Sequence, residues 1–212
     1  MVADFNLYLI TDRRQTRERY LMDVVKGALQ GGVDAIQLRE KDLNAVDLLK
    51  LGRRIRELTE EYEAKLFLND RVDIAIAVDS DGVHLGQSSF SPRDTRRLLG
   101  DNKLIGVSTH SLKEAKIAEA EGANFITLGP IFYTPSKAGY GEPLGIDILK
   151  TVKAEIGIPI FPVGGIKKKN LDIIMGAGAD GVAVISAIMA ADEPEVEAEE
   201  MIGEIERLKN RL

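Results

Sequence analysis

Gly178-Ala179-Asp180-Gly181-Val182 is one of four short segments that share a layout, and together they decide the fold class. The others are Gly32-Val33-Asp34-Ala35-Ile36, Asp79-Ser80-Asp81-Gly82-Val83 and Gly122-Ala123-Asn124-Phe125-Ile126. Each segment follows a stretch with helical spacing and leads into a short apolar run typical of a buried strand. The recurrence therefore marks the point of a repeated unit where a helix ends and the chain turns into a sheet.

Short apolar runs alternate with helical patterns along the whole chain. The expected strands are 7–10, 35–38, 66–68, 82–85, 104–107, 125–128, 160–163 and 182–185. Asn44, Ser91 and Ser111 are suited to cap the helices that follow them, and Glu114 would complete a capping box with Ser111. Eight units with this two-unit recurrence favour closure into a (β/α)8 barrel over an open doubly wound sheet. We therefore expect one α/β TIM-barrel domain over residues 1–212.

The composition narrows the classes of function. A chain of 212 residues is long enough for one well-buried domain. A net charge of −6 and the lack of a basic face argue against nucleic acid as a partner. Because cysteine is absent, disulfides, thiolate metal sites and thiol nucleophiles are excluded. No signal peptide or membrane-length apolar run is seen, so we expect a cytoplasmic protein without a membrane partner, and a homodimer stays open.

In such a barrel the catalytic residues lie at the carboxyl ends of the strands. Gly164-Gly165 and Ser186 follow the last two expected strands, where barrels commonly bind phosphate through backbone N–H groups. The alternative is that the two glycines only make a tight turn. The residues at all eight strand ends are mostly polar or glycine: 11–12, 37–41, 69–70, 86–89, 108–110, 129–137, 164–165 and 186.

The segment Gly129–Gly145 is far longer than an ordinary strand-to-helix connection of about 2–6 residues. Its glycines, prolines and hydroxyl residues, with the single Lys137, are suited to holding an anion under a closing loop. Arg39, Lys41 and Lys137 would place cations around one mouth, which suits a diphosphate better than a single phosphate. Each cation could instead be an ordinary surface residue, paired with Glu40 or Asp42.

Asp70 follows Asn69 at a strand end and could bind Mg²⁺, which proteins hold through one or two carboxylates and substrate phosphates. An equally good interpretation of Asp70 is a helix N-cap. His84 lies inside an expected strand and is expected to be structural, whereas His110 could reach a ligand or only shape a turn. The chain shows no Ser/His/Asp triad, zinc spacing or GxGxxG motif.

In their order and spacing, these motifs resemble the thiamine phosphate synthase family over essentially the whole chain. The matching segments are 8–12, 37–41, 69–71, 81–87, 129–132, 134–137, 164–166 and 185–186. The resemblance implies a transferase of thiamine biosynthesis that joins hydroxymethylpyrimidine diphosphate to a thiazole phosphate, or its carboxylate, and releases diphosphate. It also implies a Mg²⁺-assisted dissociative displacement through a carbocation-like pyrimidine, which needs charge stabilisation but no nucleophile from the protein.

The resemblance also assigns roles to residues of this chain. Lys137, Arg39 and Ser108 would be catalytic, and Asp70 would bind Mg²⁺. The pyrimidine diphosphate would be held by Gln37, Leu38, Arg39, Glu40, Lys41, Asn69, Ser108 and Lys137. The thiazole phosphate would be held by Thr134, Ser136, Gly165, Ile185 and Ser186, with Pro135 also among the substrate-binding residues.

The chain departs from the family pattern at Ser89, where the family usually has an aspartate as a second Mg²⁺ ligand. A hydroxyl can still ligate Mg²⁺, but the loss of one charge is expected to weaken metal binding. The segment Ser88–Pro92 also resembles the thiazole tautomerases of the same superfamily, which are the main alternative. Against them, Pro130 stands where a tautomerase has histidine, and a tautomerase has no diphosphate to hold. A third interpretation is a non-catalytic regulator that binds thiazole phosphate or thiamine phosphate.

Overall fold

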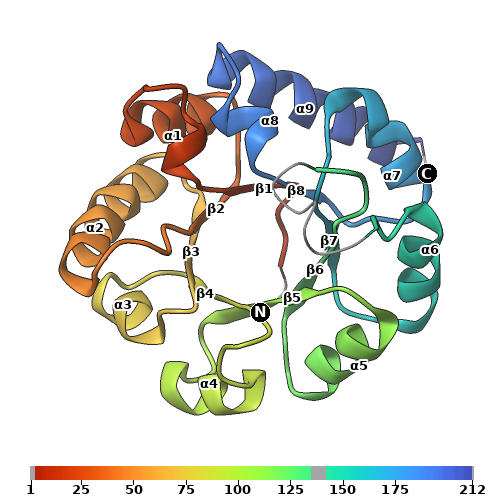
Figure 1. The fold of residues 1–212 in the computed structure, drawn as a ribbon, viewed down its shortest axis with the longest axis horizontal. Helices are drawn as coiled ribbons and strands as arrows, with labels where there is room; N and C mark the ends of the chain where they lie inside the picture. Colours follow the sequence, from red (N-terminus) through yellow and green to blue (C-terminus); the bar gives the residue numbers. More distant parts are fainter. Residues whose placement is uncertain (1–2, 135–141, 212) are drawn as a thin grey trace.

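A computed structural model describes residues 3–134 and 142–211 of the chain. Its strands form a ring, and Figure 1 looks into this ring with the helices outside it. The strands are β1 (Leu7–Ile10), β2 (Ala35–Leu38), β3 (Lys65–Asn69), β4 (Gly82–Leu85), β5 (Leu104–Thr109), β6 (Phe125–Leu128), β7 (Ile160–Pro162) and β8 (Val182–Val184). The helices are α1 (Leu21–Gln30), α2 (Ala45–Glu61), α3 (Val72–Ala77), α4 (Pro92–Leu99), α5 (Leu112–Ala120), α6 (Ile146–Glu155), α7 (Leu171–Gly176), α8 (Ser186–Met189) and α9 (Pro194–Lys209), with 3₁₀ turns η1 (Arg13–Gln15) and η3 (Lys168–Asn170).

The sheet confirms the predicted (β/α)8 barrel. Its strands are all parallel and follow the order β7-β6-β5-β4-β3-β2-β1-β8, so that β1 pairs with both β2 and β8. The ring is nearly closed between β7 and β8, where the Asp180 N–H donates to the Ile160 carbonyl at 3.1 Å. The predicted bounds hold with small shifts: β5 runs on to Thr109, and β7 and β8 end one residue earlier than expected.

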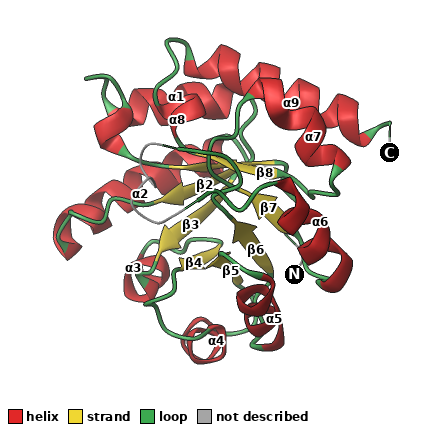
Figure 2. Cartoon of the chain, turned by 45° about the vertical axis from the view of Figure 1, so that its right-hand side comes forward, coloured by secondary structure: helices red, strands yellow, loops and turns green. Residues whose placement is uncertain are grey.

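Alternating side chains along the strands fill two layers, as the period of two in a strand requires. Residues that face outward, such as Leu66 and Leu68, pack between the strands and the helices drawn red in Figure 2. The buried cluster that faces inward at the amino end contains several aromatic side chains, and Phe5 and Phe161 stack with ring centroids 4.4 Å apart. Stacked and edge-to-face contacts of this kind fill the barrel at its amino end.

The four repeated segments share a side-chain contact that explains their common layout. In each of them the third residue, an aspartate or asparagine, accepts a hydrogen bond from a backbone N–H at the start of an odd-numbered strand. These four residues, here called the strand anchors, are Asp34 (to Leu7 N, 3.0 Å), Asp81 (to Leu66 N, 2.8 Å), Asn124 (to Ile105 N, 2.8 Å) and Asp180 (to Ile160 N, 2.9 Å).

Three of the strand anchors also contact a cation from the helix that leads into that odd-numbered strand. The ion pairs and hydrogen bonds are Arg56–Asp81, Arg96–Asn124 and Lys153–Asp180, each at 2.7 Å. At the fourth anchor, burial raises the pKa of Asp34 and the charge of Lys209 on α9 acts in the opposite direction. The anchors therefore tie helix, strand and following loop together at the amino end of the barrel.

The first residue of each repeated segment adopts a left-handed backbone conformation, which explains the recurrence of glycine there. The φ angle is 91° at Gly32, Gly122 and Gly178, and 51° at Asp79. The three predicted helix caps are also present, because Asn44, Ser91 and Ser111 each accept a hydrogen bond from the third residue after them.

Replacing Asp180 by alanine should lower the free energy of unfolding by about 2–3 kcal/mol, because the buried Ile160 N–H and Lys153 would both lose their partner. Asp180→Asn keeps an acceptor oxygen, as Asn124 does in the equivalent place, and should cost far less. Urea denaturation followed by circular dichroism measures both values. Equal losses for the two variants would mean that the hydrogen bond to Ile160 N does not account for the stabilisation by Asp180.

Candidate active site

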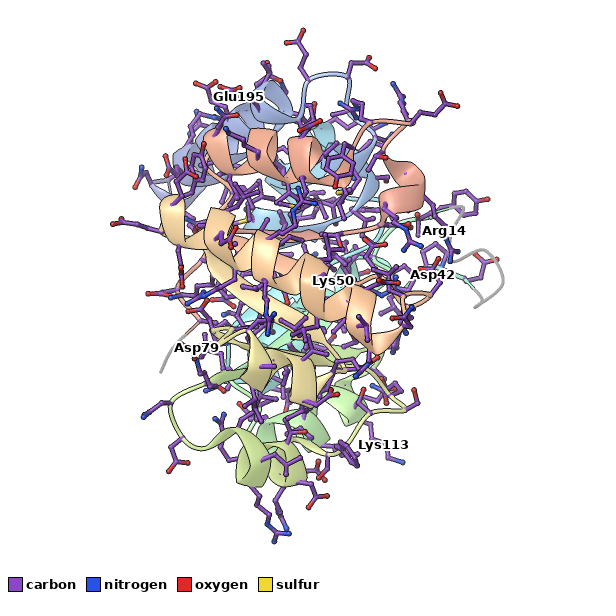
Figure 3. All side chains as sticks on the ribbon, turned by 90° about the vertical axis from the view of Figure 1, so that its left-hand side faces the viewer. Arg14, Asp42, Lys50, Asp79, Lys113 and Glu195 are labelled. Atoms are coloured by element: carbon purple, nitrogen blue, oxygen red, sulfur yellow. The ribbon has the colours of Figure 1, made fainter. Side chains whose placement is uncertain are left out.

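The mouth of the barrel is the ring of loops at the carboxyl ends of the strands. Hydrogen bonds join these loops to one another: Arg39 N donates to Thr11 Oγ1 at 2.9 Å, and Gly129 N donates to the Thr109 carbonyl at 3.1 Å. Figure 3 shows the two ends of the barrel, with Arg14 and Asp42 together at the mouth and Asp79 at the opposite end. The predicted site residues follow these strands and so belong to the loops around this one opening.

In the loop after β2, the acidic residues Glu40 and Asp42 pair with the arginines of η1. The Glu40 side chain is 2% exposed and accepts hydrogen bonds from Arg13 N at 3.1 Å and Arg13 Nη1 at 3.1 Å. Arg13 also binds Asp42 at 2.7 Å. Hydrogen bonds from Arg13 and then Arg14 hold the pKa of Asp42 well below its usual range. The interpretation that Arg39 and Lys41 are paired with Glu40 and Asp42 is therefore wrong, since the neighbouring arginines take both carboxylates.

Arg39 and Lys41 remain available at the mouth. Among the described residues Arg39 makes no ion pair and is half-buried, and its charge is close enough to affect His84. Lys41 is 58% exposed, and its Nζ lies 4.0 Å from Asp70 Oδ2. The preceding Leu38 is turned away from the mouth, because its side chain packs in the layer between strands and helices. Any ligand contact of Leu38 or of the buried Glu40 would therefore involve the backbone.

Asp70 is held by the loop after β4 and caps no helix. Its Oδ1 accepts from Gly86 N at 3.1 Å and from the Ser89 hydroxyl, and its Oδ2 accepts from Asn69 Nδ2 at 2.8 Å. The N-cap position of α3 is Arg71, which makes no side-chain cap. The N-cap interpretation of Asp70 is therefore wrong, and the carboxylate is part of a loop-to-loop contact.

Ser89, the residue that departs from the family pattern, lies directly against Asp70. Its hydroxyl donates to the Asp70 carboxylate and accepts from Gly86 N at 2.7 Å. Across residues 3–134 and 142–211, no group of three or more His, Asp or Glu side chains is arranged to hold a metal ion. The two predicted metal ligands are thus adjacent, but they supply a single carboxylate.

A chain of buried polar side chains forms the floor of the mouth inside the barrel. Gln37 Nε2 donates to the Tyr8 hydroxyl at 3.1 Å, and Tyr8 lies 3.3 Å from His84 Nδ1. His84 Nε2 lies 3.0 Å from Ser108 Oγ and 3.3 Å from Thr127 Oγ1. Ser108 is half-buried, and the other members are at most 2% exposed. The predicted catalytic serine is therefore the upper end of this network.

His84 is a neutral group in this setting. Burial lowers its pKa to about 3, with a smaller opposing effect from Asp70 and a smaller lowering effect from Arg39. Gly106 on β5 makes room for the ring, because a Cβ there would lie 2.7 Å from His84 Nδ1 and 2.3 Å from Phe125 Cζ. Sequence reasoning identified His84 as structural and missed its contact with Ser108, since a single strand position does not reveal cross-barrel neighbours.

The glycines after β7 have a structural reason of their own. Gly164 and Gly165 have φ angles of 95° and 66°, and a Cβ at Gly164 would lie 2.6 Å from Pro130 Cβ. The loop after β6 pairs with them, as Phe132 N donates to the Gly164 carbonyl at 3.0 Å. The tight-turn interpretation is therefore correct as far as the backbone is concerned, and a phosphate role for Gly165 stays a prediction.

The remaining predicted residues lie on the same side of the mouth or outside the described part of the chain. Ile185 precedes α8, Ser186 begins it, and Thr134 is half-buried. His110 Nδ1 lies 3.1 Å from Glu114 Oε2, which also accepts from His110 N, so Glu114 bonds here and not to Ser111 as a capping box requires. Pro135, Ser136 and Lys137 lie outside the described residues.

Comparison with known proteins gives a consistent result over nearly the whole chain. A family model described as thiamine monophosphate synthase matches residues 7–188. A putative thiamine-phosphate synthase of Geobacter sulfurreducens is 54% identical over 200 residues, which cover 94% of each chain. A thiamine-phosphate synthase of Clostridium novyi is 42% identical over 193 residues, 91% of this chain and 95% of that one. Among solved structures, a thiamine phosphate pyrophosphorylase from Pyrococcus furiosus is 37% identical, with a TM-score of 0.88 and 97% of each chain covered.

The state of His84 predicts a pH dependence of stability. Its pKa is about 3 in the folded chain and about 6.5 when unfolded, so protons bind preferentially to the unfolded chain between these values. The folded chain has its full stability with respect to His84 above pH 6.5, where the ring is neutral in both states. This stability is lost as the pH falls towards 3, because the unfolded chain then binds a proton that the folded chain does not. Between pH 6.5 and 4.5 the protein should lose on the order of 2–3 kcal/mol more than a His84→Gln variant, measured by urea denaturation at each pH. Parallel pH curves would show that the folded imidazole binds protons normally.

Proposed function

The chain belongs to the thiamine monophosphate synthase family, and we propose that it couples hydroxymethylpyrimidine diphosphate with thiazole phosphate, or its carboxylate. The products would be thiamine phosphate and diphosphate. The observation in this chain that carries the proposal is the state of Arg39, a half-buried guanidinium without an ion pair among the described residues. Such a cation at the barrel mouth is suited to an anionic leaving group.

The charges around the mouth fit a dissociative displacement. In such a reaction the bond from the pyrimidine methylene carbon to diphosphate breaks first, and the thiazole nitrogen then bonds to that carbon. The protein needs to stabilise charge on the departing diphosphate and to position both partners. Arg39 and Lys41 would serve the first need, and the bonds from Arg13 to Glu40 hold their segment in place. We add Lys137 as a third cation on the family resemblance.

The two substrates would divide the mouth between its two halves. We assign the pyrimidine diphosphate to the ends of β2, β3 and β5, where Arg39, Asn69 and Ser108 lie. We assign the thiazole phosphate to the ends of β6 to β8. The residues proposed there are Thr134, Pro135, Ser136, Gly165, Ile185 and Ser186. The strand order supports this division, because β2 to β5 are consecutive neighbours and β6 and β7 continue from them.

Mg²⁺ is the cofactor that the family resemblance implies, and the residues present fit it in a limited way. A magnesium ion is usually held by one or two carboxylates together with water and substrate phosphates. Asp70 is one such carboxylate, 4.0 Å from Lys41, and the Ser89 hydroxyl adjoins it. When bound, the ion would neutralise negative charge on the diphosphate. We therefore propose Asp70 as the main ligand and Ser89 as a neutral one.

The direct test incubates the protein with both substrates and Mg²⁺ and measures diphosphate release and thiamine phosphate formation. Both products are expected in equal amounts. Isomerisation of the thiazole carboxylate phosphate without coupling would identify a tautomerase. Binding of thiazole phosphate or thiamine phosphate with neither reaction would identify a regulatory protein.

Lys137→Ala should reduce coupling by roughly a hundredfold or more, because the charge on the departing diphosphate would lose one of its cations. The control is Lys50→Ala, which removes an exposed lysine on α2 and should leave the rate unchanged. Circular dichroism should show the same fold for both variants. Coupling at the wild-type rate in Lys137→Ala would remove this residue from the proposed mechanism.

Ser89→Asp should bind Mg²⁺ about tenfold more tightly, because a second carboxylate would then adjoin Asp70. Ser88→Asp is the matched control, since it adds the same charge at an exposed neighbouring position. Isothermal titration with MgCl₂ in the absence of substrate measures the affinity independently of turnover. If the two variants titrate alike, Ser89 does not contact the ion.

A further inference from the structure

We propose that Tyr8 and His84 are positioning residues that direct the hydroxyl proton of Ser108 out of the barrel and into the mouth. The inference deepens the proposed function and rests on it for the identity of the ligand. In the polar network on the floor of the mouth, the position of the proton on one group determines which atom of the next group carries a proton. Because the members of this network below Ser108 are buried, each must use its donors and acceptors within the barrel.

The direction of the network is set at its lower end. Gln37 Nε2 donates to the Tyr8 oxygen at 3.1 Å. A phenol has a single proton, and among the described residues the other hydrogen-bond partner of this oxygen is His84 Nδ1 at 3.3 Å. Tyr8 therefore donates to Nδ1. A Tyr8 hydroxyl that accepted from both sides would leave its own proton without a partner inside the barrel.

The imidazole passes this direction on to Ser108. A neutral imidazole carries one N–H, so an Nδ1 that accepts from Tyr8 places the proton on Nε2. Nε2 lies 3.0 Å from Ser108 Oγ and 3.3 Å from Thr127 Oγ1. Both hydroxyl oxygens can accept from this N–H. The ring is 1% exposed, and such burial favours an uncharged imidazole.

The consequence is a free donor at the mouth. Among the described residues, the Ser108 hydroxyl has no hydrogen-bond partner other than His84. Having accepted from Nε2, it keeps its proton for a ligand. With the opposite tautomer, Ser108 would donate downward and present only lone pairs to the mouth. Lone pairs would repel a diphosphate oxygen, whereas an O–H would donate to it, so the tautomer of His84 decides whether Ser108 assists the anion.

The tautomer can be read directly by long-range ¹H–¹⁵N correlation spectra of the wild-type protein without substrate. The chain has two histidines, so a His110→Gln variant assigns the signals. We expect His84 in the neutral Nε2–H form. An Nδ1–H form would overturn the proposal, whatever the catalytic activity.

The functional test compares two replacements of His84. Gln has an amide N–H of similar reach to Nε2, whereas Leu fills the space without a donor. His84→Leu should lower kcat for coupling roughly ten- to hundredfold with little change in KM for thiazole phosphate, the size expected for losing a hydrogen bond to a charged group. His84→Gln should stay close to wild type. Thr59→Val, which removes a buried hydroxyl bonded at 3.0 Å to the Arg56 carbonyl on α2, controls for loss of stability alone.

A double-mutant comparison tests whether His84 acts through the orientation of Ser108. In a Ser108→Ala background, His84→Leu should cause no further loss, because the hydroxyl to be oriented is gone. Independent, multiplying losses would overturn the proposal, and so would equal losses in His84→Leu and His84→Gln. Binding of inorganic diphosphate with Mg²⁺, measured by calorimetry, should weaken alike in His84→Leu and Ser108→Ala. If the wild type catalysed no coupling, the proposed function would fail while the tautomer and diphosphate measurements still decided this inference.

Discussion

The barrel depends on one interaction made four times, the hydrogen bond from the start of an odd-numbered strand to the strand anchor of the following unit. A strand that begins at a helix end has an unpaired N–H there, and a buried N–H without a partner is costly. Asp34, Asp81, Asn124 and Asp180 supply that partner. At Asp180 the same residue also bonds to β7 through its backbone, where the β-ladder itself stops. The amino end of the barrel is thereby fixed, and the mouth at the other end is free to carry loops of different length.

Above this fixed end the inward face of β3 and β6 changes from aromatic to polar within two residues. Phe125 is followed on the same face by Thr127, and Phe67 by Asn69. The transition is possible because the polar side chains satisfy one another, as in the chain from Gln37 to Ser108. The side chains below the site therefore have few alternative conformations. That rigidity is what positioning of a substrate requires.

Much of this could be predicted from the sequence, because apolar periodicity and helix caps are local signals. The strands, the cap residues and the barrel followed from them, and the repeat showed where helices give way to strands. What could not be predicted are contacts between segments distant in the chain. The pairing of Glu40 with Arg13, the bond of Asp70 to Gly86, and the meeting of His84 with Ser108 each depend on which strands become neighbours. Periodicity carries no information on such pairings.

Ser89 shows how such contacts change the meaning of a single residue. Beside Asp70 an aspartate would create like-charge repulsion, whereas a hydroxyl donates to the carboxylate and leaves one negative charge. Arg13 and Arg14 pair with the nearby Glu40 and Asp42, which leaves Arg39 and Lys41 on this side of the mouth unpaired with those two carboxylates. In the proposed reaction, a mouth with serine at position 89 would rely more on these side chains, and less on Mg²⁺, to neutralise a departing diphosphate.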